Sequence, residues 1–298
     1  MIKALLVIGI SMLLSIPVYS QNTGDDDIPR IDLATIAQEN SGNSYITFPT
    51  DIGNIEPLWF EANLIPSFNI RVSKDSRLMG VLTPQIIIRM YQEESFPVRT
   101  PSYMPQLTMY YSLNSKPAVK SFNLFGKLAH HSNGQEGNFY LDNGEINTIS
   151  GNFSTNYFEL GLVRTRYNKR FNAVQFFSTS FEAHPKNLMI DELDGIYSRY
   201  RWNNVVSFFK LPVNGAAAKK ASISLKGEVT WMFGELNGWE SYSINRLNVK
   251  LTFYYHPKFL EDIGIFAQIY HGMDYYNIYF DHQISVIRFG IMTEKLRF

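Results

Sequence analysis

The chain of 298 residues contains no cysteine, so it has no disulfide, no thiol nucleophile and no N-terminal cysteine for a lipid anchor. Its 27 basic and 27 acidic residues cancel, which removes the net field that would draw the chain to nucleic acid. Beyond the first residues, no apolar run is long enough for a membrane helix. These absences argue against a nucleic-acid partner and against a helical membrane protein.

The N-terminus has the pattern of an export signal. Lys3 supplies the positive charge, residues 4–14 form a mostly apolar core, and Val18-Tyr19-Ser20 precedes an expected cleavage ahead of Gln21. We therefore expect residues 1–20 to be a signal peptide. Residues 21–43 are polar and read as a solvated leader, because their acidic run lacks the alternating spacing of a calcium loop.

Aromatic residues and alternating segments dominate the rest of the chain. There are 18 Tyr and 22 Phe, and residues 221–231 place apolar and polar side chains on opposite faces. A soluble sandwich strand and a membrane barrel strand share this alternation. The fold is all-β in either case.

Three features favour the barrel. Segments of about ten residues recur between polar links. Aromatic pairs such as Tyr254-Tyr255 and Phe208-Phe209 stand near segment ends, where interfacial girdles lie, and the chain ends on Phe298 after a strand-like segment. We predict that residues 44–298 form an outer-membrane antiparallel β-barrel of about 12 strands, which would leave no exposed sheet edge.

Eleven strands are clear in the sequence, and residues 44–48 are the candidate for a twelfth, because bacterial single-chain barrels have even strand numbers. The eleven expected strands lie near residues 64–73, 79–91, 105–113, 120–132, 154–167, 171–183, 197–210, 220–232, 242–255, 262–272 and 284–298.

The end of the segment 120–132 carries the first candidate site residues. Successive side chains of a strand alternate between faces, so His130 and Ser132 share a face with Leu124 and Leu128, whereas His131 lies on the other. A candidate base and a candidate nucleophile thus share an apolar surface.

The same test on the next strand adds Asn156, which is in phase with Phe158 and Leu160. If the two strands are hairpin neighbours, Asn156, His130 and Ser132 converge on one apolar wall. That set matches acyl transfer, in which Ser attacks, His takes its proton and a third group orients the imidazole.

Four motifs, in order along the chain, resemble those of the outer-membrane phospholipase A family, calcium-dependent acyl hydrolases of Gram-negative bacteria. The segments are Ser95-Phe96-Pro97-Val98-Arg99 with Tyr103-Met104-Pro105-Gln106-Leu107, His130-His131-Ser132-Asn133-Gly134, Ser154-Thr155-Asn156, and Gln268-Ile269-Tyr270-His271-Gly272 with Arg288-Phe289-Gly290.

The resemblance implies a twelve-stranded barrel with its active site on the outside, facing the outer leaflet, and membrane phospholipids as substrate. It implies that Ser132 is the nucleophile, His130 the base and Asn156 the orienting group, with the Gly134 amide in the oxyanion hole. It also implies Ca²⁺, with Ser95, the Gln135 carbonyl and Asn152 at ligand positions, and a homodimer.

The chain departs from the family pattern in the loop between the two strands. The family places an Asp five residues after the nucleophile, where this chain has Gly137, so Glu136 or Asp142 would have to substitute. Asn152 stands where the family has a calcium-binding Ser.

Two other readings remain open at this level. A catalytically inactive structural or channel-forming barrel would show the same alternation, but it gives no reason for Ser, His and Asn to share the lipid-facing side. A secreted soluble sandwich that binds sugar is the third reading.

Overall fold

The computed structural model describes residues 31–48, 52–114, 120–212, 220–293 and 296. The expected signal peptide, the first part of the leader and Phe298 lie outside these residues. The strands are β1 (Tyr45–Thr47), β2 (Leu58–Leu64), β3 (Phe68–Ile70), β4 (Leu78–Tyr91), β5 (Ser102–Ser112), β6 (Ser121–Ser132), β7 (Ser154–Asn168), β8 (Ala173–Ala183), β9 (Tyr200–Lys210), β10 (Ile223–Phe233), β11 (Leu247–Tyr255), β12 (Ile263–Met273) and β13 (Gln283–Thr293).

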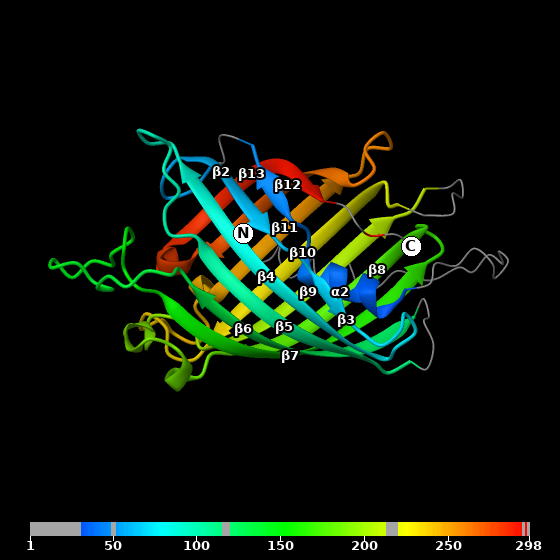
Figure 1. The fold of residues 1–298 in the computed structure, drawn as a ribbon, viewed down its shortest axis with the longest axis horizontal. Helices are drawn as coiled ribbons and strands as arrows, with labels where there is room; N and C mark the ends of the chain where they lie inside the picture. The colour runs from blue at the N-terminus through cyan, green and yellow to red at the C-terminus, as the bar shows by residue number, and fades with distance from the viewer. Residues whose placement is uncertain (1–30, 49–51, 115–119, 213–219, 294–295, 297–298) are drawn as a thin grey trace.

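These strands form one closed antiparallel barrel (Figure 1). From β4 to β13, each strand pairs with the next, and β1 joins β13 to β2, which returns to β4. Because β2 and β3 both pair with β4 end to end, they act as one interrupted strand. The ring is therefore twelve strands wide, which confirms the predicted fold and the twelfth strand near residues 44–48.

The first predicted strand was placed wrongly. The segment 64–73 is split, and pairing with β4 instead begins at Leu58 and stops before Pro66. Proline has no N–H to donate to the ladder, so the pairing breaks there and resumes at Phe68. Residues 242–246 also precede β11 rather than belonging to it. The other described strand ends agree with the prediction within a few residues.

The outer and inner faces of the barrel have opposite character. Leu128, Phe158 and Leu160 point outward, and Leu160 is 71% exposed. Inward positions carry charges such as Lys127 and Glu159, whose Nζ and Oε2 atoms are 2.7 Å apart. An apolar exterior around a polar interior is the pattern of a membrane barrel and the reverse of a soluble sandwich, so the sandwich reading is wrong.

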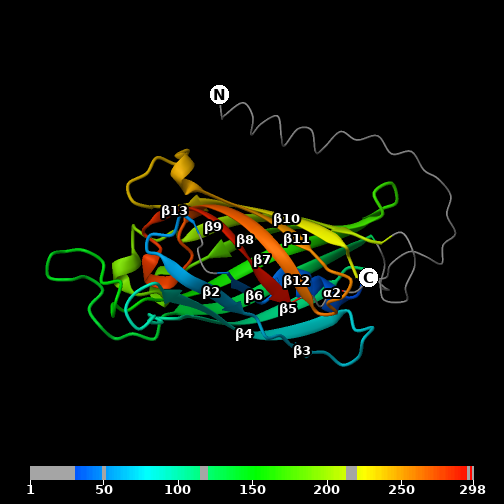
Figure 2. The same cartoon turned by 90° about the horizontal axis from the view of Figure 1, so that it is seen from above.

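A short helix, α2 (Leu33–Ser41), lies inside the barrel (Figure 2). Its Glu39 accepts from Ser207 of β9 and pairs with Lys226 of β10, while Asn40 donates to Tyr110 of β5 on another part of the wall. Leu33 and Ile36 pack in an apolar cluster with inward residues of the strands. The expectation of a solvated leader is therefore wrong for this segment, because the barrel supplies both apolar and charged partners for it.

The two ends of the barrel differ in their connections. Long segments join β4 to β5, β6 to β7, β8 to β9, β10 to β11 and β12 to β13 at one end, which we call the loop end, and α2 lies toward the other (Figure 1). Three of these long loops carry the 3-10 turns: η2 (Lys186–Leu188) and η3 (Asp191–Leu193) in the β8–β9 loop, η4 (Ile244–Arg246) before β11 and η5 (Asn277–Tyr279) before β13. No helix among the described residues is long and apolar enough to cross a membrane.

Candidate active site

Strands β6 and β7 place His130 and Asn156 directly opposite each other near the loop end. The two side chains meet, with His130 Nδ1 and Asn156 Oδ1 2.9 Å apart. Cross-strand partners point to the same side of a sheet, so this contact follows from the register once the two strands are neighbours. The structure therefore brings together two of the three residues expected to form the triad.

A second hydrogen bond fixes the orientation of the Asn156 amide. Asn156 Nδ2 donates to the Leu188 carbonyl at 2.8 Å, so Oδ1 is the atom that faces His130. An amide oxygen only accepts, so His130 Nδ1 carries the proton and Nε2 of the neutral ring is left with its lone pair. Nε2 is thus the atom available to take a proton.

Ser132 follows His130 by two residues on the same outward face of β6 and pairs with Ser154 of β7. Two strand residues advance the chain by about 6.6 Å, so the Ser132 side chain has to turn toward the ring for its Oγ to reach His130 Nε2. Among the described residues, nothing engages the Ser132 hydroxyl in a hydrogen bond.

An open groove of about 490 Å³ runs along the outer surface beside His130 and Asn156. Most of its walls are apolar, and they come from four strands and from the loop after β8. The lining includes Leu82, Leu107, Leu128, Phe158 and Leu188. A groove of this shape can accept an acyl chain while presenting its ester to the polar side chains.

The turn after Ser132 is held by the buried side chain of Asn133. Asn133 Nδ2 donates to the Gly151 carbonyl at 2.8 Å, and Asn133 Oδ1 accepts from the Phe153 backbone N–H at 3.0 Å. These two bonds connect the ends of the β6–β7 loop. Gly134 follows with φ +68, a conformation that favours glycine. Within the part of the chain that the structure describes, the Gly134 N–H has no acceptor, as an oxyanion donor requires.

The residues expected to hold calcium come from two loops. Ser95 lies in the β4–β5 loop, whereas Gln135 and Asn152 lie at the two ends of the β6–β7 loop. All three offer neutral oxygens, which suit a hard cation but add no charge to hold it. Among the described residues, no group of three or more His, Asp or Glu side chains forms a metal cluster. Three neutral oxygens of this kind would hold a hard cation only weakly, with water completing its shell.

The backbone around Gly137 explains why no aspartate stands five residues after Ser132. A Cβ atom at this position would lie 2.3 Å from the Ser150 carbonyl oxygen, because the Gly137 amide donates to that carbonyl. The backbone of the loop approaches itself too closely here for an aspartate. Glu136 and Asp142, the candidate substitutes, are both exposed in the same loop.

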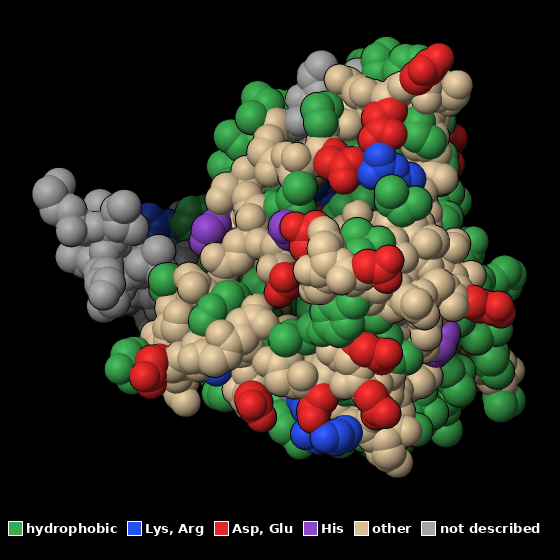
Figure 3. All heavy atoms as spheres, turned by 90° about the vertical axis from the view of Figure 1, so that its left-hand side faces the viewer, with side chains coloured by type: hydrophobic (Ala, Val, Ile, Leu, Met, Phe, Trp, Pro, Cys, Tyr) green, Lys and Arg blue, Asp and Glu red, His purple; other side chains and the backbone are tan. Residues whose placement is uncertain are grey.

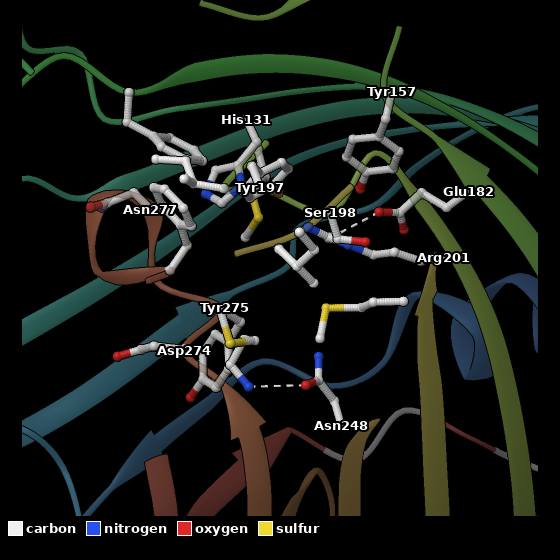
Figure 4. Close-up of a pocket in the computed structure, with 17 residues that line it drawn as sticks. His131, Tyr157, Glu182, Tyr197, Ser198, Arg201, Asn248, Asp274, Tyr275 and Asn277 are labelled. Atoms are coloured by element: carbon white, nitrogen blue, oxygen red, sulfur yellow. Dashed lines mark hydrogen bonds and ion pairs between the residues drawn. The ribbon is translucent and has the colours of Figure 1, made fainter. Parts of the chain in front are cut away.

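His131 belongs to the interior, as expected. It is 7% exposed, and its ring meets Phe153 edge to face at 4.9 Å. It lines an internal cavity of about 160 Å³ together with Tyr157, Glu182 and Arg201 (Figure 4). Adjacent histidines of one strand thus serve opposite faces of the wall.

The β8–β9 loop is the part of the site that the sequence did not indicate. Its first residue, His184, is buried and forms two hydrogen bonds. His184 Nδ1 lies 2.9 Å from Thr155 Oγ1, and His184 Nε2 lies 2.8 Å from Glu182 Oε1. Burial lowers the pKa of His184, which keeps the ring neutral. The same loop presents the Leu188 carbonyl to Asn156, and a carbonyl has no sequence signature.

Comparisons with known proteins give a structural likeness only. No protein-family model matches the chain, and no curated protein matches its sequence. The fold is similar to outer membrane phospholipase A from Escherichia coli, with a TM-score of 0.59, 14% identity and coverage of 92% of this chain and 95% of that one. The fold is also similar to the Salmonella typhi outer membrane phospholipase dimer with bound calcium, with a TM-score of 0.53 and 14% identity. That match covers 88% of this chain and 96% of the other.

Proposed function

We propose that this protein is an outer-membrane phospholipase that hydrolyses acyl ester bonds of phospholipids. The observation that carries the proposal is the hydrogen bond between His130 and Asn156 on the apolar outer face, with Ser132 in phase beside it. Both polar groups stand where lipid would surround the barrel. A structural barrel has no use for an oriented imidazole at that position.

The reaction follows from the tautomer of His130. His130 Nε2 takes the proton of Ser132 as Oγ bonds to the ester carbonyl carbon, and Asn156 holds the ring in place. The Gly134 N–H donates to the carbonyl oxygen as it becomes negative. The imidazolium returns the proton to the departing alcohol oxygen, and a water molecule then releases the fatty acid by the same steps.

The surface of the barrel supports a place in the outer membrane. Its apolar exterior suits the hydrocarbon layer, and the long loops suit the side that faces outward. The proposal therefore includes an active site at the level of the outer leaflet. The Salmonella typhi neighbour is a dimer, and the proposal includes a homodimer for this chain.

The side chains inside the barrel argue against a channel-forming function. Inside the barrel, Glu61 accepts from Arg89 at 2.8 Å and from Arg288 at 2.7 Å, and all three side chains are buried. Helix α2 and its apolar partners occupy one end, and loop residues such as Phe153 and Phe280 pack together at the other. A water-filled porin needs an open path, which these groups occupy.

The direct test is release of fatty acid from detergent-dispersed phospholipid by the purified barrel. A sulfonyl fluoride should stop the release and label Ser132, which mass spectrometry of the digested protein can identify. If the folded barrel releases no fatty acid under any calcium concentration, the inactive-barrel reading replaces this one.

Asn156→Ala is expected to lower the rate of hydrolysis by roughly tenfold to a hundredfold. The change removes one hydrogen bond to a ring that becomes charged, a bond usually worth about 1.5–3 kcal/mol. Initial rates on a single phospholipid measure it. A loss as complete as that from removing the nucleophile would mean that Asn156 does more than orient His130.

Calcium is expected to be required. When bound, the ion would supply positive charge near the developing oxyanion, which one backbone amide compensates only in part. Ser95→Ala should raise the calcium concentration for half activity by roughly tenfold and leave the activity at saturation little changed.

The matched control for this change is Ser73→Ala, an exposed serine in the β3–β4 turn. Calcium titrations of both variants give the comparison. Full activity in excess chelator would remove the metal from the mechanism and leave the Gly134 amide to act alone.

A further inference from the structure

A second groove lies on the outer surface beside the candidate site. It has a volume of about 650 Å³ and lies between the end of β8 and the start of β9. Its lining includes Lys186, Asp191, Arg199 and Tyr200. Unlike the apolar groove that holds His130, this one carries charges of both signs.

The two grooves are contiguous. Leu188 lines the first groove, and the adjacent residue Asn187 lines the second, so the two grooves meet at the turn η2. Along the strands, Phe158 of the first groove pairs with Ala183, and Ala183 pairs with Tyr200 of the second. Neighbouring strands are about 4.8 Å apart, so roughly 10 Å separates the two grooves across the sheet.

Among the described residues, the Arg199 guanidinium forms no salt bridge, although Asp194 lies near enough to feel its charge. The Arg199 Nε atom is buried without a hydrogen-bond acceptor, and the guanidinium charge lies 5.6 Å from the centre of the Tyr200 ring. An arginine held against a ring with its N–H groups free is suited to a phosphate, whose oxygens it can bind in pairs.

The other charges complete a two-signed site. Lys186 pairs with Asp194, and that hydrogen bond lowers the pKa of Asp194, with a smaller contribution from Arg199. Asp191 is exposed and forms no hydrogen bond or salt bridge among the described residues, although its charge also acts on Lys186. One cation and one carboxylate, each without a salt bridge, therefore line the same groove.

Arg199 stands out among the charged side chains at the loop end of the barrel. Figure 3 shows the loop end of the barrel, where the charged side chains are mostly carboxylates. Such a surface repels an anionic headgroup unless a local positive charge receives it. Arg199 and Lys186 supply that charge next to the candidate site.

We propose that this groove binds the headgroup of the phospholipid being cleaved, with the phosphate at Arg199 and Lys186 and the ammonium at Asp191. The inference rests on the proposed function and assigns the substrate class, a glycerophospholipid with a zwitterionic headgroup. Only the glycerol unit separates phosphate from ester in such a lipid, so one molecule can reach both grooves.

Kinetics provide the first test. The ratio of kcat/KM for a phosphatidylethanolamine to that for an uncharged glyceride with the same acyl chains should fall about tenfold in Arg199→Gln, with partial recovery in Arg199→Lys. Arg170→Gln is the matched control, because Arg170 also lies 5.6 Å from the ring of the residue after it, in the distant β7–β8 turn. Its ratio should not change.

Binding provides the second test and does not depend on activity. In the Ser132→Ala background, Arg199→Gln should weaken binding of dihexanoylphosphatidylethanolamine about tenfold. Asp191→Asn should weaken binding of that probe but not of the matching phosphatidylglycerol, which has no ammonium. If the wild-type barrel hydrolyses nothing yet the probe binds as expected, the enzyme proposal fails and the headgroup site stands.

Three results would overturn the headgroup site. An equal fall for both substrates in Arg199→Gln would assign the residue a structural role. Unchanged binding in Arg199→Gln would remove the site. Displacement of the lipid probe by inorganic phosphate at equal concentration would assign the groove to a free anion rather than to a lipid headgroup.

Discussion

Ser132→Ala is expected to abolish acyl hydrolysis, with a fall of at least about a thousandfold in rate. The change removes the only atom that can attack the ester in the proposed mechanism, and nothing among the described residues can replace it. Barrel folding should be unchanged, because the hydroxyl has no hydrogen-bond partner there to lose. Fatty acid release measures the rate, and resistance to unfolding in detergent electrophoresis measures the fold.

Ser154→Ala is the matched control, since Ser154 lies directly across from Ser132 on β7. It should keep most of the activity. Comparable loss in the two variants would show that the rim of the barrel needs polar groups generally, and retention of activity in Ser132→Ala would end the proposed mechanism.

His130→Ala is expected to reduce hydrolysis as severely as the loss of Ser132, because the two side chains act as one unit and the proton has no other acceptor. The neighbouring His131→Ala should keep substantial activity, since that ring points into the lumen against Phe153. The comparison is sharp because the two substitutions are identical in chemistry and adjacent in sequence. Initial rates on one phospholipid suffice to measure it.

The opposite result has a definite meaning. An active His130→Ala with an inactive His131→Ala would show that the chemistry faces the lumen. A loss of folded barrel in His131→Ala, seen by electrophoresis, would be a packing effect, and His131→Gln then provides the comparison with less change in volume.

Strand alternation predicted most of the fold because each strand has one lipid-facing side and one polar side. It failed at Leu58–Leu64, where a register shift between Leu58 and Phe60 puts the exposed Trp59 out of phase with the rest of the strand. The buried Glu61 of this strand forms ion pairs with Arg89 and Arg288, which lie on other strands. Long-range pairs of this kind leave no local pattern.

The same alternation placed His130, Ser132 and Asn156 on one face, and the structure adds the register that pairs His130 with Asn156. The Leu188 carbonyl and the groove at Arg199 could not be foreseen. Both depend on how the β8–β9 loop folds back over the outer surface, and loop paths have no periodicity to read.

Helix α2 was hidden for a different reason. Its sequence is short and polar, and a helix of this length is marginal in water. It is stabilised by contacts with the inside of the barrel, and its N-terminus is capped by Asp32, which accepts from the Thr35 amide at 2.8 Å. The sequence showed the polarity correctly but not the partners.

The position of α2 also constrains the order of assembly. Only residues 42–44 connect it to β1, and β1 pairs with β13, the last strand that the structure describes. From β4 to β13 the contacts join neighbours in sequence and can form progressively, whereas this seam must wait for the whole chain. A closed ring offers no side entrance, so the helix is either enclosed when the seam closes or enters through the end of the barrel where it lies. The segment that holds α2 is thus synthesised before the strands, yet its polar contacts are with β5, β9 and β10, which follow later in the chain.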